Sequence, residues 1–390
     1  MVKKMKKIQI TTYLFFILFT LSIITTGIIA DEKSPCWERV YPTTNPVGGL
    51  DFLQYDIESD LTIGFEFDTS PRVHAYDAKE KNWIITDTNM PEIFRFGSRF
   101  AYHEILDAVI FFGGTTNFYL EEYGTNQTWA YFYNNNSWIN LNPSVAPPPR
   151  IDSYVVYDSY NEKTVIFSGI NEWSSTNYFY QDIWSYDHLT NTWTNVTPTL
   201  VPEFCYASSV TYDSDAKKIL VFGGAGRAHP GDIGEYSNEL WEFDLATTTW
   251  TELSPSGTIP SKRGYISMAY DIKNKKTILF GGTNRSFDYG DGGQTFNDTY
   301  AYDYAKNEWI KLNCSISPQA RYLPGFAYNN KEKHILLHAG GISFTDTWIF
   351  TCDESCDCPL ESDFDSLAFM STLVLLSLFV PIVRRKKKNT

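Results

Sequence analysis

The chain has 390 residues, of which 16% are aromatic and 20% charged, and its formal net charge at pH 7 is −14. The negative charge lies in the body of the chain: without the four lysines before Ile8 and the five basic residues after Val383, 23 basic residues stand against 46 acidic ones. Such a surface repels phosphate backbones, which argues against nucleic acid as a partner.

The N-terminus predicts export. A basic stretch, MVKKMKK, precedes an apolar run from Ile8 to Ala30, and the small residue Ala30 precedes Asp31. This pattern is typical of a secretory signal peptide over residues 1–30. An uncleaved membrane anchor is the alternative, and in either case the lysines stay inside and the body of the chain is exported.

A repeat fills the region from Trp37 to Thr351. A closing tryptophan recurs at steps of 55, 55, 57 and 59 residues, at Trp83, Trp138, Trp193, Trp250 and Trp309. A glycine pair recurs at 113–114, 223–224, 281–282 and 340–341, and Ser168-Gly169 holds the same place in another copy. Each unit predicts four short strands, and because one unit cannot bury both faces of its sheet, the copies are expected to stack.

These motifs resemble the kelch repeat, whose period is roughly 50 residues. The shared features are the paired glycines, a Tyr-Asp about ten residues before them, the closing Trp and an aromatic-x-aromatic-Asp strand such as Trp241 to Asp244. The resemblance implies an all-β, six-bladed kelch-type β-propeller over residues 36–352. The poorest copy is the first, where Glu66-Phe67 replaces the glycines and His74 replaces a Trp or Tyr.

The two ends of the repeat region complement each other. Trp37 to Pro42 (WERVYP) matches the closing strand of other units, such as Trp193 to Pro198 (WTNVTP), but no strands of its own unit precede it. The sixth unit has its first three strands and no closing Trp. The N-terminal strand is therefore predicted to complete the last blade and close the ring.

The C-terminus predicts a membrane span. A Cys- and Asp-rich connector over residues 353–366 precedes an apolar run over 367–383, and a basic tail over 384–390 follows. The basic cluster after the apolar run is a stop-transfer pattern. We therefore expect a cell-surface, single-pass protein with an extracellular propeller; a sorting tail that is cut and replaced is the alternative.

Six cysteines and six N-glycosylation sequons are consistent with an exported protein. Alignment places Cys36 and Cys352 on opposite sides of the missing hairpin turn, so we expect a disulfide between them, with Cys356 or Cys358 as competitors. Cys205 and Cys314 are expected to be free core residues. The sequon asparagines are Asn126, Asn135, Asn195, Asn284, Asn297 and Asn313.

Four arginines, each seven residues before a repeat tyrosine, form one candidate binding site: Arg95, Arg150, Arg263 and Arg321. In a propeller these positions begin the innermost strands and converge at the mouth of the central channel. A ring of guanidinium groups could bind a carboxylate through forked hydrogen bonds. Alternatively, each arginine pairs with a repeat aspartate and only ties the blades together.

The long loops between second and third strands are expected on the same face as these arginines. They carry aromatic residues flanked by Asp, Asn and Glu, a composition suited to stacking on sugar rings or anchoring a protein partner. Loops that only pack against one another are the alternative. The aromatic candidates are Tyr123, Trp173, Tyr178, Tyr236, Phe287 and Tyr289.

Chemistry beyond binding has little support in the sequence. The six histidines are scattered, whereas a copper enzyme of the galactose oxidase type needs paired His and Tyr ligands, and no zinc spacing, phosphate loop or nucleophile motif occurs. We expect no cofactor and no metal. The predicted function is binding or adhesion to a protein or glycan; the alternative is an epimerase or lyase acting on a carbohydrate, with an acid such as Glu235 as base.

Overall fold

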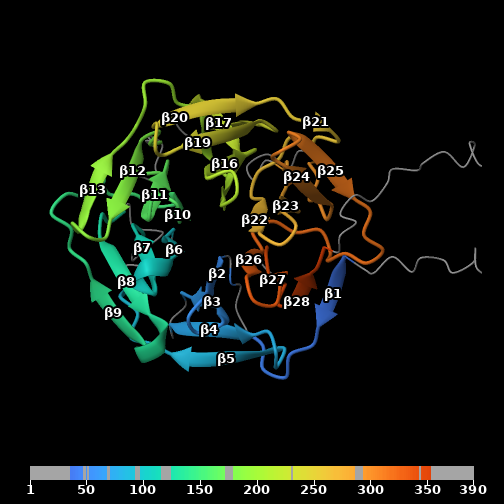
Figure 1. The fold of residues 1–390 in the computed structure, drawn as a ribbon, viewed down its shortest axis with the longest axis horizontal. Helices are drawn as coiled ribbons and strands as arrows, with labels where there is room; N and C mark the ends of the chain where they lie inside the picture. Colours follow the sequence, from blue (N-terminus) through green and yellow to red (C-terminus); the bar gives the residue numbers. More distant parts are fainter. Residues whose placement is uncertain are drawn as a thin grey trace, which may run out of the picture.

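The structure is a computed structural model that describes residues 36–46, 50, 52–67, 71–92, 97–115, 124–171, 179–229, 232–285, 293–341 and 344–352. In these ranges the chain is all-β, apart from two 3-10 turns, η2 (Glu104–Leu106) and η3 (Tyr133–Asn135). Six sheets surround one axis, each with four antiparallel strands, as the view down that axis shows (Figure 1). The predicted six-bladed kelch-type propeller is confirmed.

Each blade runs outward from the axis in chain order, except that the last takes its outermost strand from the N-terminus. Blades 1 to 3 consist of β2 (Leu53–Asp56), β3 (Leu61–Glu66), β4 (Arg72–Asp77), β5 (Asn82–Asp87); β6 (Arg99–His103), β7 (Ala108–Phe112), β8 (Thr128–Phe132), β9 (Ser137–Asn140); and β10 (Tyr154–Asp158), β11 (Lys163–Phe167), β12 (Ile183–Asp187), β13 (Thr192–Asn195). Blades 4 to 6 consist of β15 (Ser209–Asp213), β16 (Lys218–Phe222), β19 (Leu240–Asp244), β20 (Thr249–Leu253); β22 (Ser267–Asp271), β23 (Lys276–Phe280), β24 (Thr299–Asp303), β25 (Glu308–Leu312); and β26 (Gly325–Asn329), β27 (His334–His338), β28 (Thr347–Phe350), β1 (Trp37–Val40).

Two additions extend blades 4 and 5. A small three-stranded sheet belongs to the fourth repeat, and one short strand pairs in parallel with β25 at the outer edge of blade 5. These strands are β14 (Phe204–Tyr206), β17 (Ala225–His229), β18 (Asp232–Tyr236) and β21 (Ser256–Gly257).

A Tyr-Asp pair marks the end of the innermost strand in blades 1, 3, 4 and 5, and blades 2 and 6 have Tyr102-His103 and Tyr328-Asn329 there. In blade 3 the Asp158 carboxylate accepts the backbone N–H groups of Tyr160 and Asn161 at 3.0 and 3.1 Å. An aspartate that binds the backbone ahead of it stabilises a tight turn. The face that carries these turns is called the turn face below, and the opposite face, where the innermost strands begin, is the loop face.

Large aromatic side chains fill the wedges between the blades. Trp37, Trp83 and Trp193 are fully buried. Each indole N–H donates to a threonine hydroxyl of the preceding blade, at 3.0 Å to Thr299, 3.1 Å to Thr347 and 2.9 Å to Thr128, respectively. A tryptophan can bury this much area between blades because its polar atom finds a partner there.

The predicted ring closure is confirmed. β1 pairs antiparallel with β28, with Trp37 opposite Phe350 and Val40 opposite Thr347. In Figure 1 the blue N-terminal strand lies beside the red C-terminal strand. The Trp37 ring also contacts the rings of Phe280 and Phe350, with centroids 5.0 and 5.2 Å apart, so β1 joins blade 6 to blade 5 as well.

The predicted Cys36–Cys352 disulfide is wrong, because Cys36 is bonded to Cys314, with their Cα atoms 5.2 Å apart. Cys314 lies in the loop after β25, which passes beside the start of β1. The register bears on the error: Cys36 continues β1 opposite Thr351 and not opposite Cys352, and the Thr351 N–H donates to the Cys36 carbonyl at 3.0 Å. Cys352 belongs to a different disulfide.

Breaking the Cys36–Cys314 bond is expected to destabilise the propeller by about 2 to 4 kcal/mol, because the bond closes a loop of 278 residues. Cys314→Ser, Cys36→Ser and the double variant should unfold at the same urea concentration, since they lose one shared bond. Peptide mapping without reduction should recover Cys36 joined to Cys314. A double variant clearly weaker than either single variant would contradict this pairing.

The prediction of a single-pass membrane protein is wrong, because the structure has no helix of the required kind among its described residues. No helix within the ranges given above is long and apolar enough to cross a membrane. The segments that suggested export and anchoring, residues 1–30 and 353–390, lie outside the described residues.

All six sequon asparagines lie on the surface of the propeller: Asn126, Asn135, Asn195, Asn284, Asn297 and Asn313 are exposed. Glycosylation at these positions remains a prediction.

Candidate functional site

The repeat arginines are buried between strands and do not line an open ring. Arg150, Arg263 and Arg321 are each at most 1% exposed. Each guanidinium bonds in a forked manner to an aspartate at the start of the third strand of its own blade, namely Asp182, Asp298 and Asp346.

Each of these arginines also donates to a backbone carbonyl at the end of the second strand, and its guanidinium stacks on an aromatic ring. For Arg263 the carbonyl is that of Gly281, at 3.1 Å, and the Phe296 ring centroid lies 3.8 Å from the guanidinium carbon. With all donors directed inward, these three side chains are not presented to a ligand. Each pairs with a repeat aspartate, as in the alternative that the sequence left open, but this pair ties the strands of one blade together and not one blade to the next. Arg95 lies outside the described residues.

The paired glycines allow the backbone of the next blade to approach. A Cβ atom on Gly113 would lie 2.3 Å from the Arg150 carbonyl oxygen, and one on Gly281 would lie 2.6 Å from that of Arg321. Both glycines have a positive φ. The repeat Gly and Arg positions therefore form one interblade contact, in which only glycine fits.

A ring of strained backbone follows the repeat arginine positions. In blades 2 to 6 the residue two positions after the arginine, or after Cys205 in blade 4, has a positive φ: Gly97, Asp152, Ala207, Tyr265 and Leu323. Backbone hydrogen bonds of 2.7 to 2.9 Å join these residues from one blade to the next, from Asp152 to Gly97, Tyr265 to Ala207 and Leu323 to Tyr265. A left-handed conformation costs a bulky residue about 1 to 3 kcal/mol, so its presence at Tyr265 and Leu323 points to a constrained, preorganised rim.

This rim surrounds a hollow of about 250 Å³ at the loop-face mouth of the central channel. Its wall includes Phe52, Tyr154, Tyr206 and Tyr265. The Tyr265 ring meets that of Tyr206 edge to face, with centroids 5.6 Å apart, and that of Tyr322 at 6.2 Å. The mouth is therefore a largely aromatic cup held by a hydrogen-bonded backbone ring.

One ion pair lies in the cup. Arg99, the first residue of β6, bonds through its guanidinium to the Asp152 carboxylate and lies 4.3 Å from the Phe52 ring centroid. Both side chains are about one-fifth exposed, so they face the hollow, unlike the repeat arginines. A ligand would meet a guanidinium and a carboxylate already in place on an aromatic wall.

Two tyrosines of the cup, Tyr154 and Tyr265, stay protonated at neutral pH. Burial and, next, the neighbouring Tyr206 raise the pKa of Tyr265, and burial raises the pKa of Tyr154. The Tyr154 hydroxyl accepts the Ser208 backbone N–H at 2.6 Å. These phenols are therefore neutral hydrogen-bonding groups.

A waist that is apolar except for Gln54 lies between this cup and a second hollow of the channel. Leu53, Val155, Val210, Met268 and Phe326, from five innermost strands, border both the cup and a second hollow of about 220 Å³ at the turn face. A ligand in the cup therefore rests on hydrophobic side chains.

Of the aromatic loop candidates, only Tyr236 is described. Its hydroxyl donates to the Arg285 carbonyl at 3.2 Å, and its ring covers Gly264, next to the cup residue Tyr265. Tyr123, Trp173, Tyr178, Phe287 and Tyr289 lie outside the described residues.

Sequence reasoning missed the cup residues Arg99, Asp152, Tyr206 and Tyr265. The signal lay within one to four residues of the repeat arginine positions. An acidic and a bulky residue, Asp152 and Tyr265, stand where blade 2 has Gly97. No group of three or more His, Cys, Asp or Glu in the described part of the chain is arranged to hold a metal ion.

Similar proteins are known for much of the chain. It is 26% identical over 280 residues to Host cell factor of Drosophila melanogaster, which covers 64% of the chain and 18% of that protein. It is 29% identical over 129 residues to N-(sulfonatooxy)prop-2-enimidothioate sulfolyase of Thlaspi arvense, and over 107 residues to Kelch domain-containing protein 10 of Xenopus tropicalis. These matches cover 32% and 26% of the chain, and 33% and 25% of the two proteins. The chain thus spans a third or less of each of these relatives.

The solved structure of YjhT superposes with a TM-score of 0.59 at 19% identity, covering 80% of the chain and 97% of YjhT. This similarity supports the propeller fold alone. The sequence profile of the Attractin/LZTR1 beta-propellers matches residues 62–319, about two thirds of the chain. The protein is therefore a kelch-type propeller of the Attractin/LZTR1 beta-propeller family.

Proposed function

We propose that the propeller is a protein-binding module that holds a segment of its partner on the loop face, with one side chain inserted into the aromatic cup. The cup itself is the observation that supports this proposal. It is a concave site on rigid strands, walled by Phe52, Tyr154, Tyr206 and Tyr265, with the Arg99–Asp152 pair inside. Aromatic and arginine side chains dominate the binding energy of protein interfaces, and kelch-type propellers generally bind protein partners.

The dimensions favour a side chain over a whole ligand. A volume of about 250 Å³ is below the range of about 300 to 1,000 Å³ typical of pockets that enclose a drug-sized molecule. The apolar waist below the cup and the ion pair on its wall suit an apolar or aromatic side chain whose backbone bonds to Arg99 or Asp152.

The carbohydrate-active alternative has less support. Glu235, the acid that could act as a base, is fully exposed and lies 3.5 Å from the Lys262 ammonium. The two charged side chains of the cup are already bonded to each other. Incubation of any bound sugar with the protein, followed by NMR, would reveal turnover.

Tyr265→Gly offers a sharp test of the cup. Glycine adopts a positive φ freely, so the variant removes the ring and relieves strain together, and its stability should stay within about 1 kcal/mol of the parent. Ala207→Gly is the matched control, because it changes the same backbone position of the neighbouring blade and removes only a methyl group.

Peptides selected from a displayed random library on the intact protein should bind Tyr265→Gly at least tenfold more weakly, since a central aromatic anchor contributes about 2 kcal/mol or more. The same peptides should bind Ala207→Gly as they bind the parent. Equal binding to all three proteins, with folding confirmed by circular dichroism, would place the binding site elsewhere.

A further inference from the structure

A hollow of about 390 Å³ lies at the outer rim of the ring, where blade 6 meets blade 1. Its wall comes from β1 with the residues just after it, and from the turn between β4 and β5. In Figure 1 the tip of β1 points toward this junction with blade 1. The hollow is larger than the aromatic cup, and the two walls share no described residue. Its volume falls within the range of about 300 to 1,000 Å³ that is typical of ligand pockets.

Tyr41 stands out in this wall, because the repeat fold does not require it. It is 77% exposed and lies four residues after the closing tryptophan Trp37. The other five repeats have a smaller polar residue at this position, namely Asp87, Asn142, Thr197, Ser254 and Asn313. A large aromatic ring is therefore presented to solvent at one place in the ring of blades where the fold accepts a small polar residue.

The Tyr41 ring is held in position. The guanidinium carbon of Arg39 lies 5.2 Å from the Tyr41 ring centroid and 5.9 Å from that of Trp348. Trp348 is itself buried, and its indole N–H donates to the Asp346 carboxylate at 2.7 Å. Cation–π contacts to both rings thus connect the exposed tyrosine to the blade core. Because most of its surface stays open, the ring can serve as a preorganised platform for a ligand.

Polar side chains with fixed orientations lie around this platform. The side-chain oxygen of Asn82 accepts the Thr43 hydroxyl at 3.2 Å and the Thr44 backbone N–H at 2.9 Å. With the oxygen so occupied, the amide N–H groups of Asn82 point away from these donors. Across the hollow, the Lys81 ammonium donates to the Glu38 carboxylate at 2.7 Å.

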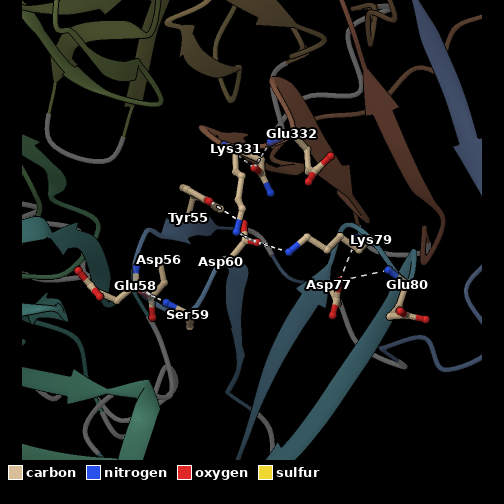
Figure 2. A network of polar contacts seen from close by, with 11 residues as sticks. Tyr55, Asp56, Glu58, Ser59, Asp60, Asp77, Lys79, Glu80, Lys331 and Glu332 are labelled. Carbon is tan, nitrogen blue, oxygen red and sulfur yellow. Dashed lines mark hydrogen bonds and ion pairs between the residues drawn. The ribbon is translucent and has the colours of Figure 1, made fainter.

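The turn between β4 and β5 adds a carboxylate. Asp77 fixes this turn by accepting the backbone N–H groups of Lys79 and Glu80 at 2.9 and 3.1 Å. The Lys79 side chain leads to Asp60, to which it donates at 2.8 Å, together with Lys331 of blade 6 at 2.7 Å. Figure 2 shows that Glu80 points away from Asp60 and from both of these lysines. Glu80 instead lines the rim hollow.

The charges of the wall cancel. Glu38 and Lys81 are paired, and Arg39 and Glu80, one positive and one negative, form no ion pair with a described residue. A wall without net charge favours neither an anion nor a cation. It offers hydrogen-bond donors and acceptors side by side, which suits groups that both donate and accept, and hydroxyl groups do both.

We propose that the rim hollow binds a neutral saccharide. One face of a pyranose ring carries apolar C–H groups, which would stack on Tyr41, and its edge carries hydroxyl groups, which would bond to Asn82, Glu80 and Arg39. An apolar ligand would leave these polar groups unpaired, and a charged one would gain nothing from the balanced wall. The site lies outside the central channel, so the propeller can hold a saccharide at its rim and a protein segment in the cup at the same time.

Saturation-transfer NMR on the full chain tests this proposal with methyl glycosides of the common neutral hexoses, N-acetylhexosamines and pentoses. At least one should bind with a dissociation constant of about 10 mM or below, with the strongest saturation on its ring C–H protons. The matching uronic acids and amino sugars should bind no more tightly. If no neutral glycoside binds in this range, or if a charged sugar binds at least about tenfold more tightly than its neutral counterpart, the proposal is overturned.

Variants locate the site. Tyr41→Ala should weaken binding of the glycoside at least about tenfold by removing the platform, whereas Tyr41→Trp keeps an aromatic platform and should bind nearly as the parent does. Asn82→Asp keeps the acceptor oxygen, removes the amide donors and should weaken binding severalfold. Because Tyr41 is exposed, its variants should melt within about 2 °C of the parent.

Two exposed side chains provide matched controls. Ser254→Ala changes the equivalent repeat position of blade 4, and Tyr160→Ala removes an exposed tyrosine of another blade. Both variants should bind the glycoside as the parent does. Binding that survives Tyr41→Ala and is lost in Tyr265→Gly would assign the glycoside to the cup and contradict the proposal.

Discussion

Lowering the pH from 7 to 5 is expected to reduce the free energy of unfolding by about 5 kcal/mol, because three buried histidines must stay neutral in the folded protein. Burial, and next the neighbouring His188, lower the pKa of His103 to about 4. Burial lowers the pKa of His334 to about 4 and that of His338 to about 3. In the unfolded chain each histidine has a pKa of about 6.5.

The sign follows from proton uptake. Below pH 6.5 the histidines of the unfolded chain bind protons, whereas the buried histidines of the folded protein do not. The free energy of unfolding is therefore highest above pH 6.5 and falls as the pH drops toward 4. Each of the three histidines contributes just under about 2 kcal/mol to the loss between pH 7 and 5. Burial also lowers the pKa of His74, which adds to the loss in the same direction.

The charged groups around these histidines do not reverse the effect. His103 faces His188 and Lys163, His338 faces His74, Arg321 and Asp346, and His334 faces Lys81 and Glu38. The carboxylates with lowered pKa, such as Asp60 at about 2, lose their contribution only below about pH 4. Burial raises the pKa of Glu104, Asp107 and Asp213, and these carboxyl groups offset part of the histidine loss as the pH falls.

Urea unfolding at pH 7, 6 and 5 measures this effect. His334→Gln should reduce the slope of stability against pH by one proton, about 1.4 kcal/mol per pH unit, whatever its effect on absolute stability. A free energy of unfolding that is flat from pH 7 to 5 would mean that the buried histidines are protonated in the folded protein, contrary to their burial.

The second large effect concerns β1. Removing residues 1–42 is expected to destabilise the propeller by more than about 5 kcal/mol, because loss of a buried Trp alone costs about 3 to 5 kcal/mol and loss of the disulfide adds about 2 to 4. Trp37 is fully buried against Phe280 and Phe350, and β1 covers the outer edge of β28.

Removal of residues 1–35 is the matched control, since it keeps Cys36, β1 and every contact described for them. By calorimetry the shorter truncation should leave the melting temperature unchanged, and the longer one should lower it by about 8 °C or more. If both truncated proteins melt together, closure of the ring by β1 contributes little to stability.

Much of the fold could be predicted from residue spacing. The recurrence of Trp, Gly-Gly and Tyr-Asp fixes strands and turns locally, and the displaced closing strand Trp37 to Tyr41 implied a ring closed by both ends. Such predictions succeed because each hallmark has a local cause. Asp158 binds the backbone of its own turn, and Gly113 and Gly281 allow the adjoining blade to approach.

The candidate site could not be predicted in full, because residue spacing does not show which way a side chain points. Spacing placed the repeat arginines at the start of the innermost strands, but only the tertiary structure decides whether a guanidinium points into the channel. Arg263 turns inward to Asp298, whereas Arg99 faces the cup. The disulfide prediction failed because the register of β1 sets Thr351, not Cys352, opposite Cys36, and the loop after β25 brings Cys314 to it.

The first repeat shows what the sequence predicts and what only the tertiary structure adds. Glu66 and His74 each break the kelch pattern in the sequence, and separately they look like decay of the repeat. In the structure they lie on neighbouring strands, and His74 Nε2 is 2.8 Å from the Glu66 carboxylate. The sequence by itself determined the number of blades and their closure, because these follow from local periodicity. The tertiary structure decided which side chains meet, because register and strand orientation bring together residues that the period keeps apart.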